Sequence, residues 1–162
     1  MSRPSRLLVS RKDRRRSSRK HTIGLADAER LVFGSQLKLD EGDYAQADAL
    51  AYKAMLQAAI ALVRTEFQDV ADDPNTIVNE FRARFYDTNL LSDRYAGNKF
   101  AQYLFRRHDS PTRQHTHDHA HRIVEEAQLF IEAVYACHDS IKERGTAFAF
   151  GKPPVQVGKA AR

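Results

Sequence analysis

Apolar residues recur at intervals of three and four along most of this chain, and this spacing predicts helices. The clearest stripe runs late in the chain through Ala120, Ile123, Val124, Ala127, Phe130, Ile131, Val134, Cys137 or His138, and Ile141. Such spacing over several turns is typical of an amphipathic helix. Ser110-Pro111 provides a capping side chain followed by proline, and Gly145 provides a stop. We therefore expect this helix to span residues 110–144.

Weaker stripes and turn signals predict four earlier helices. They cover residues 25–39, 44–67, Asn75 or Thr76 to Phe85, and 98–107, with an ordered loop over 87–97. Asn75 or Thr76 is the expected cap of the third helix, and Asn98 is the expected cap of the fourth. The many alanines of the second helix predict a closely approaching neighbour helix. No segment has a convincing strand pattern, so we expect an all-α fold, an up-and-down bundle of about five helices.

The net charge of +5 is distributed very unevenly. Residues 1–20 hold nine Lys/Arg and one Asp, for a net charge of +8, while the rest holds 17 basic and 20 acidic residues, for −3. We therefore expect a disordered basic arm over 1–23, a helical domain over 24–145 and a flexible C-terminal tail over 146–162. The basic candidates for nucleic-acid binding are Arg14, Arg15, Arg16, Arg19 and Lys20. A solubilising tail is the alternative interpretation of the arm.

The single cysteine and the hydropathy limit where the protein works. Cys137 is the only cysteine, so no intrachain disulfide can form, which fits a reducing cytosol. Its place on the apolar stripe predicts a buried, unreactive thiol. No apolar run approaches the ~18–20 residues that a membrane span needs. We expect a cytoplasmic protein that has no membrane partner.

Candidate chemistry is concentrated in Arg113-Gln-His-Thr-His-Asp-His-Ala-His121. If this run is helical, His115 and His119 share one face, and His117 and His121 share another, because residues four apart are neighbours. Two such histidines can bind zinc or a similar metal. However, no HExxH motif or third ligand is apparent, so we expect no bound metal. A solvated histidine cluster at a helix start is the other interpretation. His138, deep in the helix, is expected in the core or at its edge.

The chain resembles the HEPN domain, a helical bundle named for higher eukaryotes and prokaryotes nucleotide-binding. The resemblance lies in the alanine-rich segment 48–62 and the late helical segment 120–133. HEPN domains carry an arginine, roughly four to six residues, and then a histidine near the start of a late helix. Arg113 and His119 match this motif, with five residues between them. Segments 81–105 and 125–133 are also similar to the HEPN-like module appended to, or encoded beside, some bacterial nitrite/sulfite reductases.

The resemblance implies a homodimer in which arginine and histidine from two subunits converge on RNA. Arg113 would steady the scissile phosphate, and His119 would orient or deprotonate the 2′-hydroxyl. Many HEPN members are instead non-catalytic binding modules. The chain lacks the cysteines that hold an iron–sulfur cluster and sirohaem, so it is not itself a reductase centre, and we expect no cofactor.

Three functional hypotheses follow. The first is a non-catalytic accessory or interaction module, associated with a sulfite/nitrite reductase. The second is a metal-independent endoribonuclease, or an RNA-binding protein, that uses Arg113 and His119. The third is a metal-binding helical protein that uses the histidine pairs.

Overall fold

The computed structural model describes residues 11–66, 70–91 and 98–149, with side chains for 24–65, 70–91 and 98–144. These residues form five α-helices and one short π-helix. The helices are α1 (Arg11–Asp40), α2 (Tyr44–Glu66), α3 (Pro74–Phe81), the π-helix η1 (Arg82–Tyr86), α4 (Ala101–Asp109) and α5 (His117–Ala149). No strand occurs within the described ranges. The predicted all-α helical bundle is therefore confirmed.

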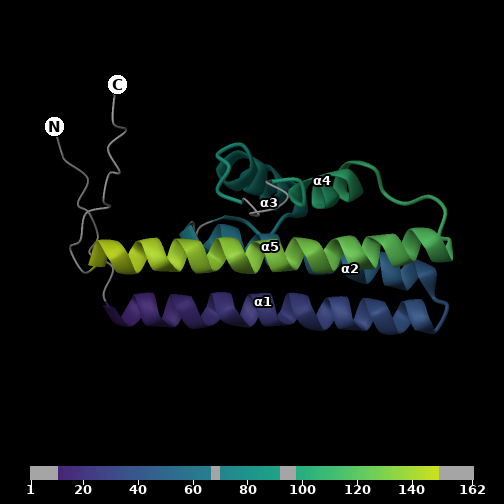
Figure 1. Cartoon of the computed structure of the whole chain (residues 1–162), viewed down its shortest axis with the longest axis horizontal. Coiled ribbons are helices and arrows are strands. Elements are labelled where there is room, and N and C mark those ends of the chain that lie inside the picture. Colours follow the sequence, from purple (N-terminus) through teal and green to yellow (C-terminus); the bar gives the residue numbers. More distant parts are fainter. Residues whose placement is uncertain (1–10, 67–69, 92–97, 150–162) are drawn as a thin grey trace, which may run out of the picture.

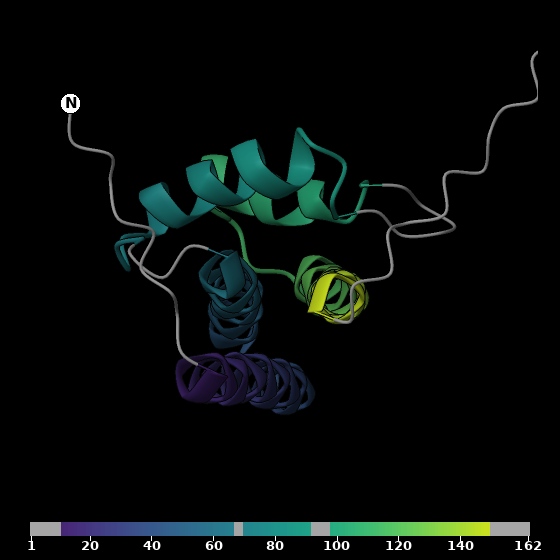
Figure 2. The same cartoon turned by 90° about the vertical axis from the view of Figure 1, so that its left-hand side faces the viewer.

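Three long helices run side by side, and the short ones lie across them. Figure 1 shows α1 and α2 as an antiparallel pair, with α5 returning in the same direction as α2. In Figure 2, α1, α2 and α5 are seen end-on, while the α3–η1 segment and α4 are seen from the side. The short helices thus cover the side of α2 and α5 that faces away from α1 (Figure 2). Up-and-down packing describes α1 and α2. The short helices α3, η1 and α4 form a second layer across α2 and α5 and complete the fold.

Small residues allow α1 and α2 to approach closely, as the alanine content predicts. Ala51, Ala54 and Ala58 of α2 are fully buried. A Cβ atom added to Gly24 of α1 would lie 3.1 Å from the Cβ of Ala61, so a larger residue would push the helices apart. The buried Ser35 hydroxyl also donates a 2.6 Å hydrogen bond to the carbonyl of Ala47. The pair is joined by packing and by a buried polar contact.

The first helix begins earlier than the hydrophobic pattern predicts. α1 starts at Arg11 and not at Leu25, so residues 11–23 are helical and are not part of a disordered arm. Arginine and lysine are good helix formers, and the segment holds no glycine or proline to stop the helix. The side chains of Arg14, Arg15, Arg16, Arg19 and Lys20 lie outside the described residues, as does everything before Arg11.

The start of α3 differs from its prediction by two or three residues. Asp73 caps it, because its carboxylate accepts hydrogen bonds from the backbone N–H and the hydroxyl of Thr76, each at 3.0 Å. Pro74 then occupies the first turn, where its missing N–H costs nothing. Asp73 therefore takes the capping position expected for Asn75 or Thr76.

The start of α4 also differs from its prediction. Asn98 does not cap this helix, which begins at Ala101. Its side-chain amide donates instead to the carbonyl of Tyr86 at 3.3 Å and to Asn89 at 3.1 Å. Asn98 therefore tethers the end of the 87–97 loop, of which residues 92–97 lie outside the described part.

The last helix continues past its predicted stop. α5 includes Gly145 and ends at Ala149. An interior glycine costs a helix only about 1 kcal/mol relative to alanine, and no proline follows before Pro153. The predicted tail over 146–162 therefore begins inside α5, and residues 150–162 lie outside the described part.

Two side chains of α5 lie where the pattern placed them, in the core. Cys137 is buried, its thiol donates to the carbonyl of Leu90 at 3.2 Å, and burial raises its pKa to about 11. The thiolate is the reactive form, so this thiol is unreactive near neutral pH, as predicted. His138 is buried as well.

Among the helices that the structure describes, none combines the length and apolar character that a membrane crossing requires.

Candidate functional site

The histidine run straddles the start of α5 and does not lie wholly within it. Ser110 closes α4 instead of opening α5, because its N–H donates to the carbonyl of Arg106. The cap of α5 is Thr116, whose hydroxyl accepts from the N–H of His119 at 3.2 Å. His115 therefore precedes the helix, and the predicted helical pair of His115 with His119 does not form.

His117 and His121 do share a face, as predicted from their spacing. Their rings stack with centroids 6.0 Å apart. His117 approaches Asp118 at 3.3 Å, and His121 approaches Glu125 at 3.7 Å. The two rings are solvent-exposed. Across the described residues, no group of three or more His, Cys, Asp and Glu side chains is arranged to hold a metal ion.

His119 lies apart from the other histidines, in a hydrogen-bond network centred on Asp48 of α2. The Asp48 side chain is only 1% exposed, and one of its oxygens accepts from Nε and Nη2 of Arg107 at 2.8 and 2.6 Å. The other oxygen accepts from the Thr112 hydroxyl at 2.7 Å. The Nε2 atom of His119 lies 3.1 Å from the Thr112 oxygen and 3.5 Å from that same carboxylate oxygen.

This network sets which nitrogen of His119 carries hydrogen. The Thr112 hydroxyl has one hydrogen, which it donates to Asp48, so its oxygen can only accept from His119. Nε2 of His119 is therefore the protonated nitrogen of the neutral ring, and Nδ1 keeps its lone pair. The side chain is 47% exposed, so His119 is anchored at one nitrogen and accessible to a ligand.

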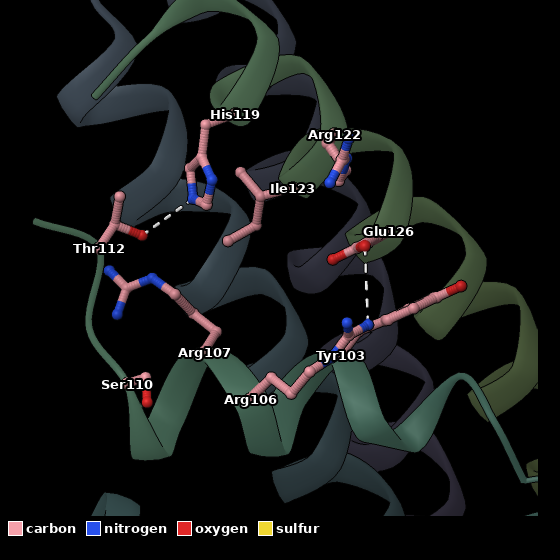
Figure 3. A pocket seen from close by; sticks show the side chains of 9 residues that line it. All are labelled: Tyr103, Arg106, Arg107, Ser110, Thr112, His119, Arg122, Ile123 and Glu126. Atoms are coloured by element: carbon pink, nitrogen blue, oxygen red, sulfur yellow. Dashed lines mark hydrogen bonds and ion pairs between the residues drawn. The ribbon is translucent and has the colours of Figure 1, made fainter. Parts of the chain in front are cut away.

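A pocket of about 270 Å³ opens beside His119, between α4 and α5. We call it the arginine pocket; Tyr103, Arg106, Arg107, Ser110, Thr112, His119, Arg122, Ile123 and Glu126 line it (Figure 3). Three arginines and one glutamate give the lining a positive charge even when His119 is neutral. One guanidinium group can donate two hydrogen bonds to two oxygens of the same phosphate or carboxylate. The pocket therefore suits an anionic ligand.

Arg107 of the pocket is also held by a second set of aromatic and polar contacts. The Arg107 guanidinium lies over the Tyr52 ring, 4.8 Å from its centroid. The Tyr52 hydroxyl lies 2.7 Å from Nδ1 of His108, and Nε2 of His108 lies 2.9 Å from the side-chain oxygen of Asn75. Burial raises the pKa of Tyr52 against the opposing effect of Arg107. Arg107 is thus fixed by Asp48 and Tyr52 together.

The structure brings together a different set of residues from the one predicted. His119 lines the pocket, whereas Arg113 is exposed on the α4–α5 connection and is not among the lining residues. Arg106, Arg107 and Arg122 lie there instead. Sequence reasoning also missed Asp48, Thr112 and Glu126. Asp48 did leave a signal, since it is a lone carboxylate beside the apolar stripe that begins at Ala47 and Ala51.

Comparisons with other proteins do not assign the chain to a family: no family model, no curated protein and no solved structure matches it.

Proposed function

We propose that the arginine pocket binds a phosphodiester of RNA and that His119 transfers a proton during its cleavage, without a metal ion. One observation carries this proposal: the ring of His119 is held by Thr112 and Asp48 at the edge of a pocket lined by three arginines. A fixed histidine beside guanidinium groups suits phosphodiester cleavage without a metal ion, because a proton must move while negative charge develops on the phosphate.

The tautomer of His119 supports a role as a base. Hydrogen bonding at Nε2 leaves Nδ1 with a lone pair, which can accept the proton of a ribose 2′-hydroxyl. The buried Asp48 carboxylate, 3.5 Å from Nε2, stabilises the imidazolium that results. Arg106 and Arg122 take the phosphate-binding role that the HEPN resemblance gives to Arg113.

The HEPN resemblance also implies a homodimer, and the exposed position of Arg113 leaves it available to a second copy. If subunits share the site, a mixture of Arg113→Ala and His119→Ala chains regains cleavage that neither variant has alone. Activity that survives Arg113→Ala in a monomer instead assigns phosphate binding to the pocket arginines. Light scattering on the same samples gives the oligomeric state.

The test is cleavage of fluorescently labelled single-stranded RNA by the full chain in EDTA. His119→Ala is expected to lower kcat by ~100–10,000-fold, the usual contribution of a positioned proton-transfer group. His121→Ala is the matched control, because it removes an exposed imidazole two residues further along the same helix, outside the pocket. Wild-type protein that neither binds nor cleaves RNA contradicts the proposal. Equal cleavage by wild type and His119→Ala contradicts it as well.

A second candidate is the accessory module that the narrower resemblance implies. A groove of about 300 Å³ between α1 and α5 favours it; Glu29, Val32, Phe33, Gln36, Gln128, Ile131 and Glu132 line this α1/α5 groove. Phe33 is 66% exposed there, and exposed aromatic rings are enriched at protein interfaces. The test is binding of a purified sirohaem sulfite/nitrite reductase, with Phe33→Glu expected to abolish it. No binding by the wild-type chain at micromolar concentration contradicts this candidate.

A further inference from the structure

We propose that Glu126 is a second catalytic residue of the arginine pocket, the general acid that protonates the leaving 5′-oxygen while His119 acts as the base. This inference rests on the proposed function. Strand scission of RNA needs two proton transfers, one from the attacking hydroxyl and one to the leaving oxygen. Tyr103, His119 and Glu126 are the lining side chains with acid–base chemistry, and His119 and Glu126 are the two that lie on α5.

Both side chains project from the same face of α5. His119, Arg122, Ile123 and Glu126 follow the spacing i, i+3, i+4, i+7, and all four line the pocket (Figure 3). Seven residues of helix advance roughly 10 Å along the axis. Both side chains lean toward the N-terminus of the helix, so the separation of the two groups stays on that order. His119 is close enough to act electrostatically on the Glu126 carboxyl, so we place the phosphodiester between the two groups, with ~3 Å needed at each end.

Its contacts position the Glu126 side chain in the pocket and leave its carboxyl accessible to a ligand. Its side chain is 23% exposed, and its Oε1 atom lies 3.8 Å from Nη2 of Arg106, which is longer than a hydrogen bond. Burial raises the pKa of this carboxyl, against opposing effects of Arg106, Arg122 and His119. A raised pKa increases the protonated fraction that a general acid needs, as in other carboxyl acids tuned by burial. The next glutamate, Glu125, is exposed and approaches His121 instead.

The proposed step balances without any further reactant. Nδ1 of His119 takes the proton of the 2′-hydroxyl, and the 2′-oxygen forms a bond to phosphorus. The bond from phosphorus to the 5′-oxygen breaks, and Glu126 gives its proton to that oxygen. The products are a 2′,3′-cyclic phosphate and a free 5′-hydroxyl. Exchange with solvent then returns a proton to Glu126 and removes one from His119.

The experiment compares Glu126→Gln with wild type on two substrates. One is single-stranded RNA, and the other is uridine 3′-(4-nitrophenyl phosphate), whose nitrophenolate leaves without protonation. Glu126→Gln is expected to lower kcat on RNA by ~100-fold or more and to cleave the nitrophenyl ester at close to the wild-type rate. With RNA as the substrate, the kcat of the wild type is expected to fall at high pH, where a general acid loses its proton. This fall is expected to disappear in the variant. Glu125→Gln is the matched control on the adjacent, exposed glutamate.

The outcomes separate this inference from the function on which it rests. If Glu126→Gln cleaves RNA with the wild-type kcat and pH profile while His119→Ala is inactive, Glu126 is not the acid and the proposed function stands. Equal slowing on both substrates also overturns the inference, because it assigns Glu126 a structural role. If wild type cleaves neither substrate, the proposed function fails and takes the inference with it.

Discussion

The two clefts that flank α5 are nearly equal in size and opposite in chemistry. The arginine pocket, between α4 and α5, has about 270 Å³, and the α1/α5 groove has about 300 Å³. The pocket holds three arginines together with His119 and Glu126, and His119 lies beside a buried carboxylate. The groove exposes Phe33 between glutamates and glutamines. The volume of a cleft therefore does not identify its function. The hydrogen-bonded polar groups distinguish the pocket, a candidate site for catalysis, from the groove, a candidate site for protein contact.

The two clefts also differ in the burial of the charged groups on the helices that form them. At the pocket, the buried Asp48 carboxylate binds Arg107 and Thr112 of the lining, and such a network keeps its geometry because breaking it leaves an unpaired buried charge. On α1, the ion pair of Arg30 with Asp27 is exposed, and exposed pairs contribute little. Changes to the pocket should therefore affect both the stability of the fold and ligand binding. Changes to the groove should affect neither the stability of the fold nor RNA cleavage.

Asp48→Ala should have the largest effect of any change at the pocket. It leaves the Arg107 guanidinium, 16% exposed, without its carboxylate, which typically costs ~3–5 kcal/mol in the free energy of unfolding. RNA cleavage should fall too, because the anchor of Thr112 and His119 is lost. Urea denaturation measures the first effect. The control, Asp109→Ala, breaks an exposed pair with Arg82 and should cost at most ~1 kcal/mol. Equal costs for the two variants would contradict a buried network.

Arg122→Ala should weaken RNA binding by an intermediate amount. Its loss removes one phosphate contact, so the slope of log affinity against log salt should fall by about 1 or less. Fluorescence anisotropy at several salt concentrations measures this slope. Arg30→Ala removes an equal charge from the α1 surface and should leave the slope unchanged. The same loss of slope in both variants would mean that overall charge, and not the pocket, attracts RNA.

Glu126→Gln should stabilise the fold slightly at neutral pH, in contrast to Asp48→Ala. Burial raises the pKa of Glu126 in the folded chain above its ordinary 4.5, so folding favours the protonated form. The cost of the charged carboxylate is absent below the unfolded-state pKa and grows as pH rises through the folded-state pKa. The difference in unfolding free energy between variant and wild type should therefore disappear below about pH 4. Thermal unfolding at pH 3.5 and pH 7 tests this, and a destabilised variant at pH 7 would contradict it.

Phe33→Ser should have the smallest effect on the molecule by itself. Its side chain is 66% exposed, so the free energy of unfolding should change by less than ~0.5 kcal/mol. RNA cleavage should be unchanged, since the groove and the arginine pocket share no lining residue. Urea denaturation and the RNA assay check both statements. Loss of RNA cleavage in Phe33→Ser would show that the two clefts are coupled.

The fold was predictable because its signals are local. Spacing of apolar residues identified the stretches that became α2 and α5. The gap between the predicted helices over 25–39 and 44–67 matches the turn at Gly42, whose φ of +80° suits glycine. Helix ends were less predictable. Whether Ser110 or Thr116 caps α5 depends on which hydrogen bonds the neighbouring helix has already taken, and Ser110 donates its N–H to α4.

The sequence by itself determined an all-α chain, a buried Cys137 and a concentration of histidines at the start of a late helix. These features depend on composition and on residues a few positions apart. Only the tertiary structure decided which histidine has partners. Asp48 is 59 residues from Arg107 and 64 from Thr112 along the chain, and their contacts exist because α4 and the start of α5 meet α2. Periodicity reports which face of a helix is buried, whereas a hydrogen-bond network depends on where distant helices cross.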